Sequence, residues 1–139
     1  AAICRKIANA KIRDEKSIEV WGDGEQTRSF MFIDDCIYGT KKIFNSNLRE
    51  VYNLGSSEQV SINQMIDMVE KIADYKVERQ YLLDKPKGVR GRSSDNTKIL
   101  SDLNWEPSIK LYEGLEKTYS WIYQSIKNPS NIQKFTSSY

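Results

Sequence analysis

Histidine is absent from the 139-residue sequence, and cysteine occurs only twice. The absence of histidine removes the side chain that most often serves as a general acid or base. Cys4 and Cys36 cannot form a disulfide framework in a domain of this size, so we interpret them as reduced, small hydrophobic residues. The sequence shows no signal-peptide pattern and no apolar run long enough to cross a bilayer. We therefore expect a cytoplasmic protein.

Neither sign of charge is in excess: 21 Lys and Arg residues oppose 19 Asp and Glu residues, for a formal net charge of +2. This balance gives no global attraction to nucleic acid or membrane, so an anion site would need a local cluster. The length suffices for one domain, and not for a cofactor domain and a substrate domain together. Because the chain starts at Ala1 and enters a helical pattern at once, we expect a piece of a longer polypeptide, although removal of a methionine before alanine would look the same.

The most informative stretch is a glycine-bearing turn at residues 21–30, with the sequence WGDGEQTRSF. Its two glycines permit a tight reversal that would bring Gln26, Thr27 and Arg28 to the rim of a cleft. An arginine in that place can grip a phosphate through two parallel hydrogen bonds. Taken alone, the stretch is explained at least as well by a purely structural hairpin turn.

The alternation of short apolar runs and helical patterns predicts a small mixed α/β unit. The expected helices begin near residues 3, 36, 61, 95 and 111, and the expected strands cover residues 17–21, 28–33, 51–55 and 77–83. Ser61 opens a capping box, and Ser94 or Asp95 is expected to cap the short fourth helix. Asp34 and Asp35 stand where a helix cap belongs, and we prefer that role to a general acid and base pair. The helix behind them should bury one stripe, made of Cys36, Ile37, Thr40, Ile43 and Phe44.

A second cationic segment covers residues 85–95, with the sequence KPKGVRGRSSD. Its four cations are spaced by proline and two glycines: Lys85, Lys87, Arg90 and Arg92. Such a loop cannot bury its charges, so it requires either solvent or an anion, and the segment alone favours neither. Two arginine loops, with Arg28 on one side and Arg92 on the other, could together face the pyrophosphate of a nucleoside diphosphate.

Several of these landmarks together resemble the extended short-chain dehydrogenase/reductases that modify nucleotide sugars. The matching segments are FMFIDD at 30–35, YNLG at 52–55, DNTK at 95–98, LNWEP at 103–107, LYEGL at 111–115 and Trp121. The resemblance implies a small mixed α/β substrate-binding domain, together with the last elements of a Rossmann-like sheet whose N-terminal dinucleotide-binding part is absent from this chain. It implies that residues 1–139 are the C-terminal substrate-binding portion and that residues 34–55 pack on the missing domain.

Within this superfamily the chain is most similar to the GDP-mannose 3,5-epimerase family, through residues 2–6, 21–30 and 88–96. Carried over by position, the resemblance implies that the nucleotide sugar is contacted by Lys6, Gln26, Thr27, Arg28 and Arg92. Without the resemblance, Lys6 is equally well explained as a solvated helix residue. Glu25 and Asn104 stand where the family commonly has an apolar residue and a glycine, and these departures bear on the substrate rather than on the superfamily.

The family chemistry, as the resemblance implies it, uses NAD to oxidise C4 of the hexose, moves protons at C3 and C5, and reduces C4 again. This chain lacks the glycine-rich dinucleotide fingerprint and a catalytic Tyr and Lys separated by three residues, and neither cysteine matches the catalytic cysteine of the family. We therefore expect no catalytic residue, no cofactor-binding residue and no metal ligand here, with NAD bound mainly by the missing domain. The expected partner is GDP-mannose, with a homodimer at full length and neither nucleic acid nor membrane.

Two alternatives stay open. One is another enzyme of the superfamily, such as a UDP-sugar epimerase, decarboxylase or dehydratase, because the pyrophosphate grip is shared. The other is a non-enzymatic anion- or RNA-binding module that uses the basic segment 85–95 and nearby tyrosines. The module predicts steep salt dependence and stacking on exposed aromatic rings, whereas the enzyme predicts selectivity for a nucleotide sugar.

Overall fold

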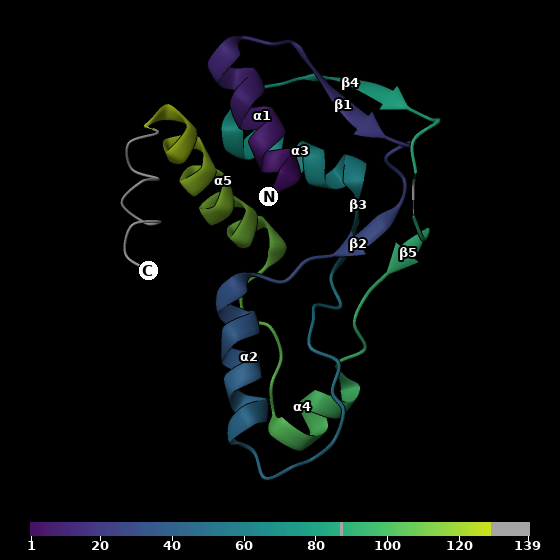
Figure 1. The fold of residues 1–139 in the computed structure, drawn as a ribbon, viewed down its shortest axis with the longest axis vertical. Helices are drawn as coiled ribbons and strands as arrows, with labels where there is room; N and C mark the ends of the chain where they lie inside the picture. The colour runs from purple at the N-terminus through teal and green to yellow at the C-terminus, as the bar shows by residue number, and fades with distance from the viewer. Residues whose placement is uncertain (87, 129–139) are drawn as a thin grey trace.

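The computed structural model describes residues 1–86 and 88–128 of the chain (Figure 1). Lys87 of the basic segment and the sequence from residue 129 onward lie outside the described residues. The elements in chain order are α1 (Ala2–Arg13), β1 (Ser17–Trp21), β2 (Thr27–Ser29), α2 (Ile33–Asn45), β3 (Gln59–Ser61), α3 (Ile62–Ala73), β4 (Glu78–Leu82), β5 (Gly91–Arg92), α4 (Thr97–Leu103) and α5 (Leu111–Lys127). This mixture of helices and short strands confirms the predicted α/β class.

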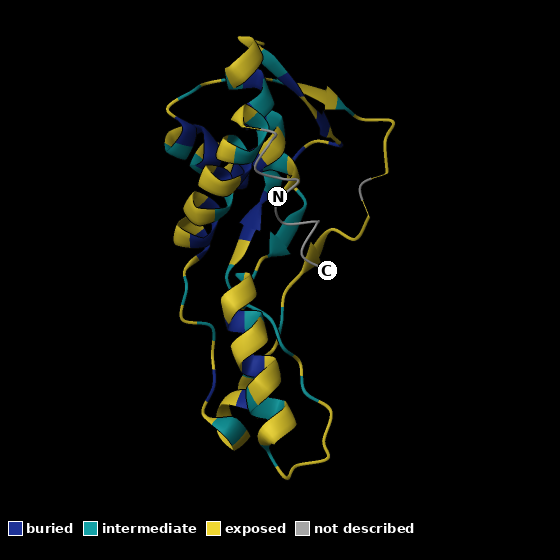
Figure 2. Ribbon diagram, turned by 60° about the vertical axis from the view of Figure 1, so that its left-hand side comes forward, coloured by how far each residue is buried: buried dark blue, intermediate teal, exposed yellow. Residues whose placement is uncertain are grey.

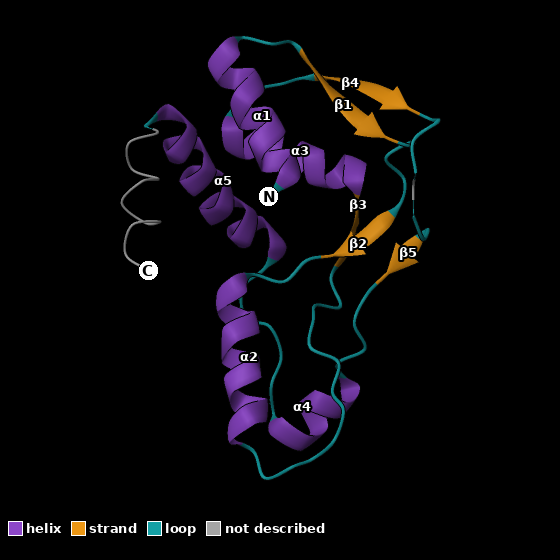
Figure 3. Ribbon diagram, in the orientation of Figure 1, coloured by secondary structure: helices purple, strands orange, loops and turns teal. Residues whose placement is uncertain are grey.

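Helices α1, α3 and α5 pack on one another at one end of the molecule, where the parallel pair of β1 and β4 also lies (Figures 1 and 3). Their apolar faces form the main core, and its fully buried members include Cys4, Ile7, Ile66 and Val69. Residues three or four apart on a helix share a face, which is why these positions meet in the core. The predicted capping box is present, since Ser61 accepts the Gln64 amide and the Gln64 side chain accepts the Ser61 amide.

A three-stranded sheet in the order β3-β2-β5 joins this core to the opposite end of the molecule (Figure 3). Strand β2 pairs antiparallel with β3 and parallel with β5. The register places Arg28 beside Arg92 and Thr27 beside Gly91. Strand β2 ends at Ser29, so the predicted strand over 28–33 is too long, because Ile33 already begins α2.

The opposite end is formed by α2, α4 and the loops around them (Figure 1). Asp35 corrects the sequence prediction, because Phe32 is the N-cap of α2 and no side chain caps this helix. The Asp35 carboxylate instead accepts three hydrogen bonds, from the Ser108 amide at 3.1 Å, the Ser108 hydroxyl at 2.9 Å and the Ile109 amide at 2.9 Å. It therefore organises the loop that leads into α5.

One further prediction for this end is wrong. Residues 51–55 form no strand, because they have no partner strand to supply ladder hydrogen bonds. The apolar stripe of α2 is largely open, as expected for a helix without the domain it was predicted to pack on: Ile37 is 52% exposed, Phe44 is 85% exposed, and Thr40 is exposed as well. Figure 2 shows this end of the molecule mostly in the colour of exposed residues. The buried residues of α2 are Asp35 and Gly39.

Candidate functional site

A cavity of about 710 Å³ opens between α1, β1, β2 and the start of α3. Three of the five residues expected to contact a nucleotide sugar line it, namely Lys6, Gln26 and Arg28. Its apolar wall includes Trp21, which is 52% exposed, and Phe30. The structure thus brings together polar groups from α1, from the glycine turn and from β2, with an exposed aromatic ring beside them.

Lys6 reaches this cavity from the polar side of α1. Its Nζ donates to the backbone oxygen of Glu19 at 2.6 Å, which ties the ammonium to strand β1. An ammonium carries three donors, so this bond leaves two for another acceptor. The lysine is therefore placed by the fold rather than lying extended in solvent.

The two polar atoms of the Gln26 side-chain amide differ, because the nitrogen is hydrogen-bonded and the oxygen is not. Its Nε2 donates to the Trp21 oxygen at 3.1 Å, which closes the glycine turn. Its Oε1 is buried and has no hydrogen-bond partner among the residues that the structure describes. Because buried polar atoms are nearly always paired, this oxygen calls for a donor from a bound molecule or a water.

Arg28 extends from β2, and its Nη1 donates to the Thr27 oxygen at 2.6 Å. The basic segment comes close to it: a Cβ added to Gly88 would lie 3.3 Å from the Arg28 Nη2, and Gly88 has a φ of +66°. A side chain at residue 88 would therefore crowd the guanidinium and strain the backbone. Gly88 lets the basic segment pass beside Arg28.

Arg92 lies on β5, directly beside Arg28 in the sheet register. Paired positions on neighbouring strands share a face of the sheet. The two arginines are therefore neighbours on adjacent strands, rather than approaching from two sides of a cleft as the sequence suggested. Arg92 is exposed and lines a second cavity of about 410 Å³ together with Ser29 and Met31.

Thr27 is half-buried and its side chain lies towards β5. A Cβ added to Gly91 would come within 2.8 Å of the Thr27 hydroxyl oxygen, so glycine is needed opposite it. Of the five predicted contact residues, three therefore share one cavity, Arg92 lines the neighbouring cavity, and Thr27 supports the strand pair between them.

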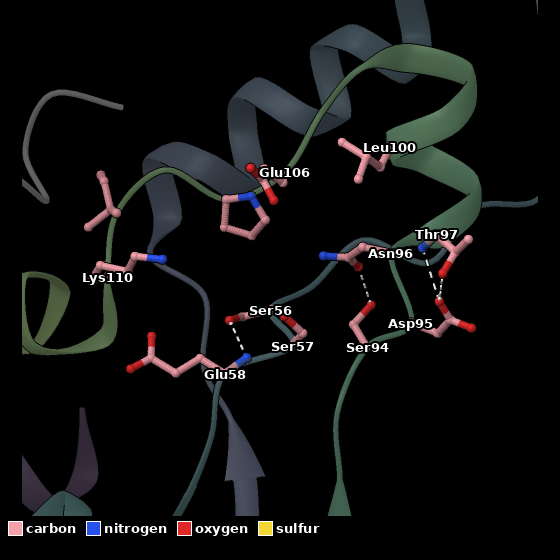
Figure 4. Close-up of a pocket in the computed structure, with 12 residues that line it drawn as sticks. Ser56, Ser57, Glu58, Ser94, Asp95, Asn96, Thr97, Leu100, Glu106 and Lys110 are labelled. Atoms are coloured by element: carbon pink, nitrogen blue, oxygen red, sulfur yellow. Dashed lines mark hydrogen bonds between the residues drawn. The ribbon is translucent and has the colours of Figure 1, made fainter.

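A third cavity, of about 320 Å³, lies between α4 and the loops at 56–58 and 106–110 (Figure 4). Its polar side chains bond to one another: the Ser94 hydroxyl donates to Asn96 Oδ1 at 2.6 Å, and Asp95 Oδ1 accepts the Thr97 hydroxyl at 2.7 Å. Asp95 also accepts the Thr97 amide, and these bonds from Thr97 lower the pKa of Asp95. The N-cap of α4 is Asn96, and not Ser94 or Asp95 as the sequence predicted. The polar groups that line this cavity are therefore largely used in holding the loops together.

Asn63 lies outside these cavities but supports the glycine turn, and no pattern in the sequence singles it out. Its amide lies behind the glycine turn and bonds to the Asp23 oxygen and to Glu25 Oε1, 40 and 38 residues away in the chain. No local pattern reveals such a contact, because it depends on how α3 docks against the turn. In the part of the chain that the structure describes, no group of three or more His, Cys, Asp or Glu side chains could hold a metal ion.

The fold, together with the cavity lined by Lys6, Gln26 and Arg28, defines a mixed α/β unit with a cationic, partly aromatic site. Residues 1–118 match the sequence pattern of the family described as GDP-mannose 4,6 dehydratase. The chain belongs to this family.

The GDP-mannose 3,5-epimerase of Arabidopsis thaliana is 45% identical over 127 residues, which cover 91% of this chain and 32% of that protein. The solved UDP-glucose 4-epimerase of Thermotoga maritima, determined with UDP-glucose, has a TM-score of 0.80 and 26% identity, with 90% of this chain and 39% of that chain covered. The UDP-glucuronic acid 4-epimerase of Bacillus cereus, determined with UDP-glucuronic acid and NAD, has a TM-score of 0.77 and 34% identity, over 88% of this chain and 40% of that chain.

The chain spans about one third of the length of the curated relatives that it matches first. Within residues 1–86 and 88–128, the structure contains no helix that is long and apolar enough to cross a membrane.

Proposed function

We propose that this chain is the nucleotide-sugar-binding portion of an NAD-dependent GDP-mannose 3,5-epimerase. The observation that carries the proposal is the shared cavity of Lys6, Gln26 and Arg28, with Arg92 in register on the next strand. The 45% identity to the Arabidopsis thaliana enzyme supports GDP-mannose as the substrate. In the whole protein the activity would be that of an isomerase, and this portion would bind without turning over.

Each of these residues has a distinct task in binding. Arg28 and Arg92 stand at paired positions of neighbouring strands, and their guanidinium groups suit the negative charges of a pyrophosphate through charge-assisted hydrogen bonds. Lys6 adds a third positive charge at the cavity wall. Gln26 Oε1, the buried and unpaired acceptor, takes a hydrogen bond from a donor on the substrate.

We propose that the described residues do not hold NAD by themselves. The sequence has no glycine-rich dinucleotide fingerprint. The described parallel pair of β1 and β4 has α3 in its crossover, but the first amides of α3 bond to the glycine turn. We therefore assign NAD binding, and the redox chemistry that NAD supplies, to sequence that relatives have in addition to this portion.

The open face of α2 supports a second part of the proposal. We propose that residues 34–55 pack on a nucleotide-binding domain in the longer protein, because Ile37 and Phe44 are exposed without it. The whole enzyme is proposed to be a cytoplasmic homodimer, on the resemblance alone.

The alternative enzyme is a UDP-sugar epimerase. It is favoured by a specific observation, since the two solved relatives were determined with UDP-glucose and UDP-glucuronic acid. Because the pyrophosphate is common to both substrates, the arginines do not distinguish them. The sugar and the base must be tested directly.

The decisive experiment uses the chain extended to the length of its relatives and loaded with NAD. Binding of GDP-mannose and UDP-glucose is measured by calorimetry at two salt concentrations, for the wild type and for Arg28→Ala, Arg92→Ala and Arg90→Ala. We expect selective GDP-mannose binding that Arg28→Ala and Arg92→Ala each weaken by roughly 1.5 to 3 kcal/mol, as for a lost hydrogen bond to a charged group. Arg90→Ala is the matched control, because Arg90 is exposed on the same basic segment and lines neither cavity.

Preference for UDP-glucose would keep the site and move the substrate to the alternative enzyme. Equal binding of any polyanion, steeply dependent on salt and weakened equally by Arg90→Ala, would overturn the enzyme proposal in favour of an anion-binding module.

A further inference from the structure

The glycine turn at residues 22–26 rests on the first turn of α3. The Ile62 amide donates to the Gln26 oxygen at 3.2 Å, and the Asn63 amide donates to the Gly24 oxygen at 3.0 Å. The first amides of a helix have no partner within the helix, so they can bind an outside acceptor. Here two of them hold the turn, and this helix end therefore serves as a platform for the turn.

The side chain of Asn63 strengthens this platform with all four of its hydrogen-bonding positions. Its Nδ2 donates to the Asp23 oxygen at 3.2 Å and to Glu25 Oε1 at 2.6 Å. Its Oδ1 accepts from the Tyr81 hydroxyl at 2.9 Å and from the Arg79 Nη1 at 3.4 Å. Two donors and two lone pairs are the full capacity of an amide, so Asn63 joins the turn to β4 with nothing left over.

The β4 end of this link is itself anchored. Arg79 forms ion pairs with Asp67 and, at 3.4 Å, with Glu70, whose side chain is only 2% exposed. On the turn side the fit is equally close, because a Cβ added to Gly24 would lie 2.3 Å from Asn63 Oδ1 and Gly24 has a φ of +76°. Asn63 thus occupies a fixed position between a braced strand and a turn that has no space for another side chain.

We propose that Asn63 is a positioning residue for nucleotide-sugar binding. By holding residues 22–26 against α3 and β4, it keeps Gln26 and Arg28 oriented towards the cavity before the substrate arrives. A site that is already ordered loses less conformational entropy on binding, so the tether raises affinity without touching the ligand. This inference rests on the proposed function and adds a residue outside the cavity wall to it.

Two tyrosines provide a matched pair for the test. The Tyr81 hydroxyl bonds to Asn63 Oδ1 at 2.9 Å, whereas the Tyr75 hydroxyl bonds to the Glu15 oxygen at 3.0 Å and to Asp14 Oδ1 at 3.3 Å, both outside the glycine turn. Tyr81→Phe removes a hydrogen bond to Asn63, and Tyr75→Phe removes hydrogen bonds that do not involve Asn63. In the NAD-loaded protein of full length, we expect Asn63→Ala to raise the Kd and KM for GDP-mannose about five- to tenfold, and Tyr81→Phe to raise them about twofold. The kcat should stay nearly unchanged, because these variants loosen the binding site and leave the reacting groups in place. Tyr75→Phe should lower the Tm and leave the Kd as it is.

Exchanging the amide and the carboxylate of the Asn63–Glu25 pair tests the hydrogen bond separately from general packing. Asn63→Asp keeps the acceptor for Tyr81 but loses the donor to Glu25 and faces its carboxylate, so binding should weaken. Glu25→Gln alone keeps the Oε1 acceptor and should bind like the wild type. Combining Glu25→Gln with Asn63→Asp restores a donor and acceptor pair in the opposite direction, and most of the lost affinity should return.

The outcomes separate this inference from the proposed function. If the wild type binds GDP-mannose and Arg28→Ala weakens binding, but Asn63→Ala leaves the Kd and KM unchanged, the positioning role is wrong and the proposed function stands. An effect of Tyr75→Phe equal to that of Tyr81→Phe, or no recovery in the double variant, would also overturn the positioning role. If the wild type binds no nucleotide sugar, the proposed function fails and this inference fails with it.

Discussion

Glu70 is the buried carboxylate on which the network around β4 depends. It accepts from the Lys76 ammonium at 2.9 Å and from the Val77 amide at 3.0 Å, and it pairs with Arg79. Burial alone would raise the pKa of Glu70, but the bonds from Lys76 and Val77 and the charge of Arg79 outweigh it, so the pKa lies below its usual value of 4.5. The charged form therefore stabilises the fold.

This gives a prediction about pH. A carboxyl group with a lowered pKa in the folded state contributes stability above pH 4.5, its usual pKa, and that contribution is lost as the pH falls through the lower folded-state pKa. We expect Glu70→Gln to reduce the free energy of unfolding by about 1 to 3 kcal/mol at pH 7, as for a lost bond to a charged group. The difference from the wild type should shrink as the pH is lowered below 4.5.

Urea unfolding at a series of pH values measures this difference. Glu116→Gln is the control, because Glu116 is exposed on α5 and its side chain makes no hydrogen bond or ion pair with the described residues. A constant deficit of Glu70→Gln at all pH values would show that the charge of Glu70 does not matter.

At the scale of elements, α2 packs against the following loops at Gly39. Gly39 is buried where the helix meets Leu54 and Trp105, and a Cβ there would lie 2.5 Å from Leu54 Cδ1 and 2.8 Å from the Trp105 ring. Contacts of that length force neighbours to move. Gly39 therefore sets how closely α2 approaches the loops that follow it.

Gly39→Ala tests this attachment. Alanine normally favours a helix over glycine, so propensity alone predicts a gain of stability. We expect the steric effect to prevail and to cost about 1 to 3 kcal/mol, as overpacking does. Thermal unfolding of Gly39→Ala against Lys41→Ala, an exposed position on the same helix, provides the comparison, and a higher Tm for Gly39→Ala would show that the contact relaxes freely.

The element scale also shows where sequence patterns suffice. The apolar spacing of α1, α3 and α5 predicted their existence, and Ser61 predicted the start of α3, because both signals lie within one helix. The same spacing predicted α2 as a helix with one apolar face, and that face is open in this chain. A pattern shows which face is apolar and does not show what covers it.

At the scale of the whole molecule, the open face of α2 is the main unsatisfied surface. The stripe contains Ile37, which is 52% exposed, and Phe44, which is 85% exposed. Exposed apolar patches of this kind mark interfaces or aggregation-prone surfaces. The 139-residue chain by itself should therefore have low stability and self-associate.

Replacing Phe44 by lysine separates the two roles of this face. Phe44→Lys should reduce self-association of the 139-residue chain in analytical ultracentrifugation. In the protein of full length it should instead lower the Tm, since it would bury a charge at the proposed domain contact. Leu83→Lys is the control, because Leu83 is 65% exposed and lies outside α2. A sharp, cooperative melt of the 139-residue chain at high temperature would contradict the prediction.

The sequence by itself determined the α/β class, the main helices, the glycine turn and the segments that carry the family resemblance. These are local patterns, in which neighbouring residues set the backbone conformation or a helix face. Only the tertiary structure decided that Arg28 lies beside Arg92, that Asn63 supports the glycine turn, and that Asp35 binds the loop before α5. Each of these depends on groups at least 38 residues apart in the chain, and their meeting is set by sheet register and helix docking rather than by local sequence.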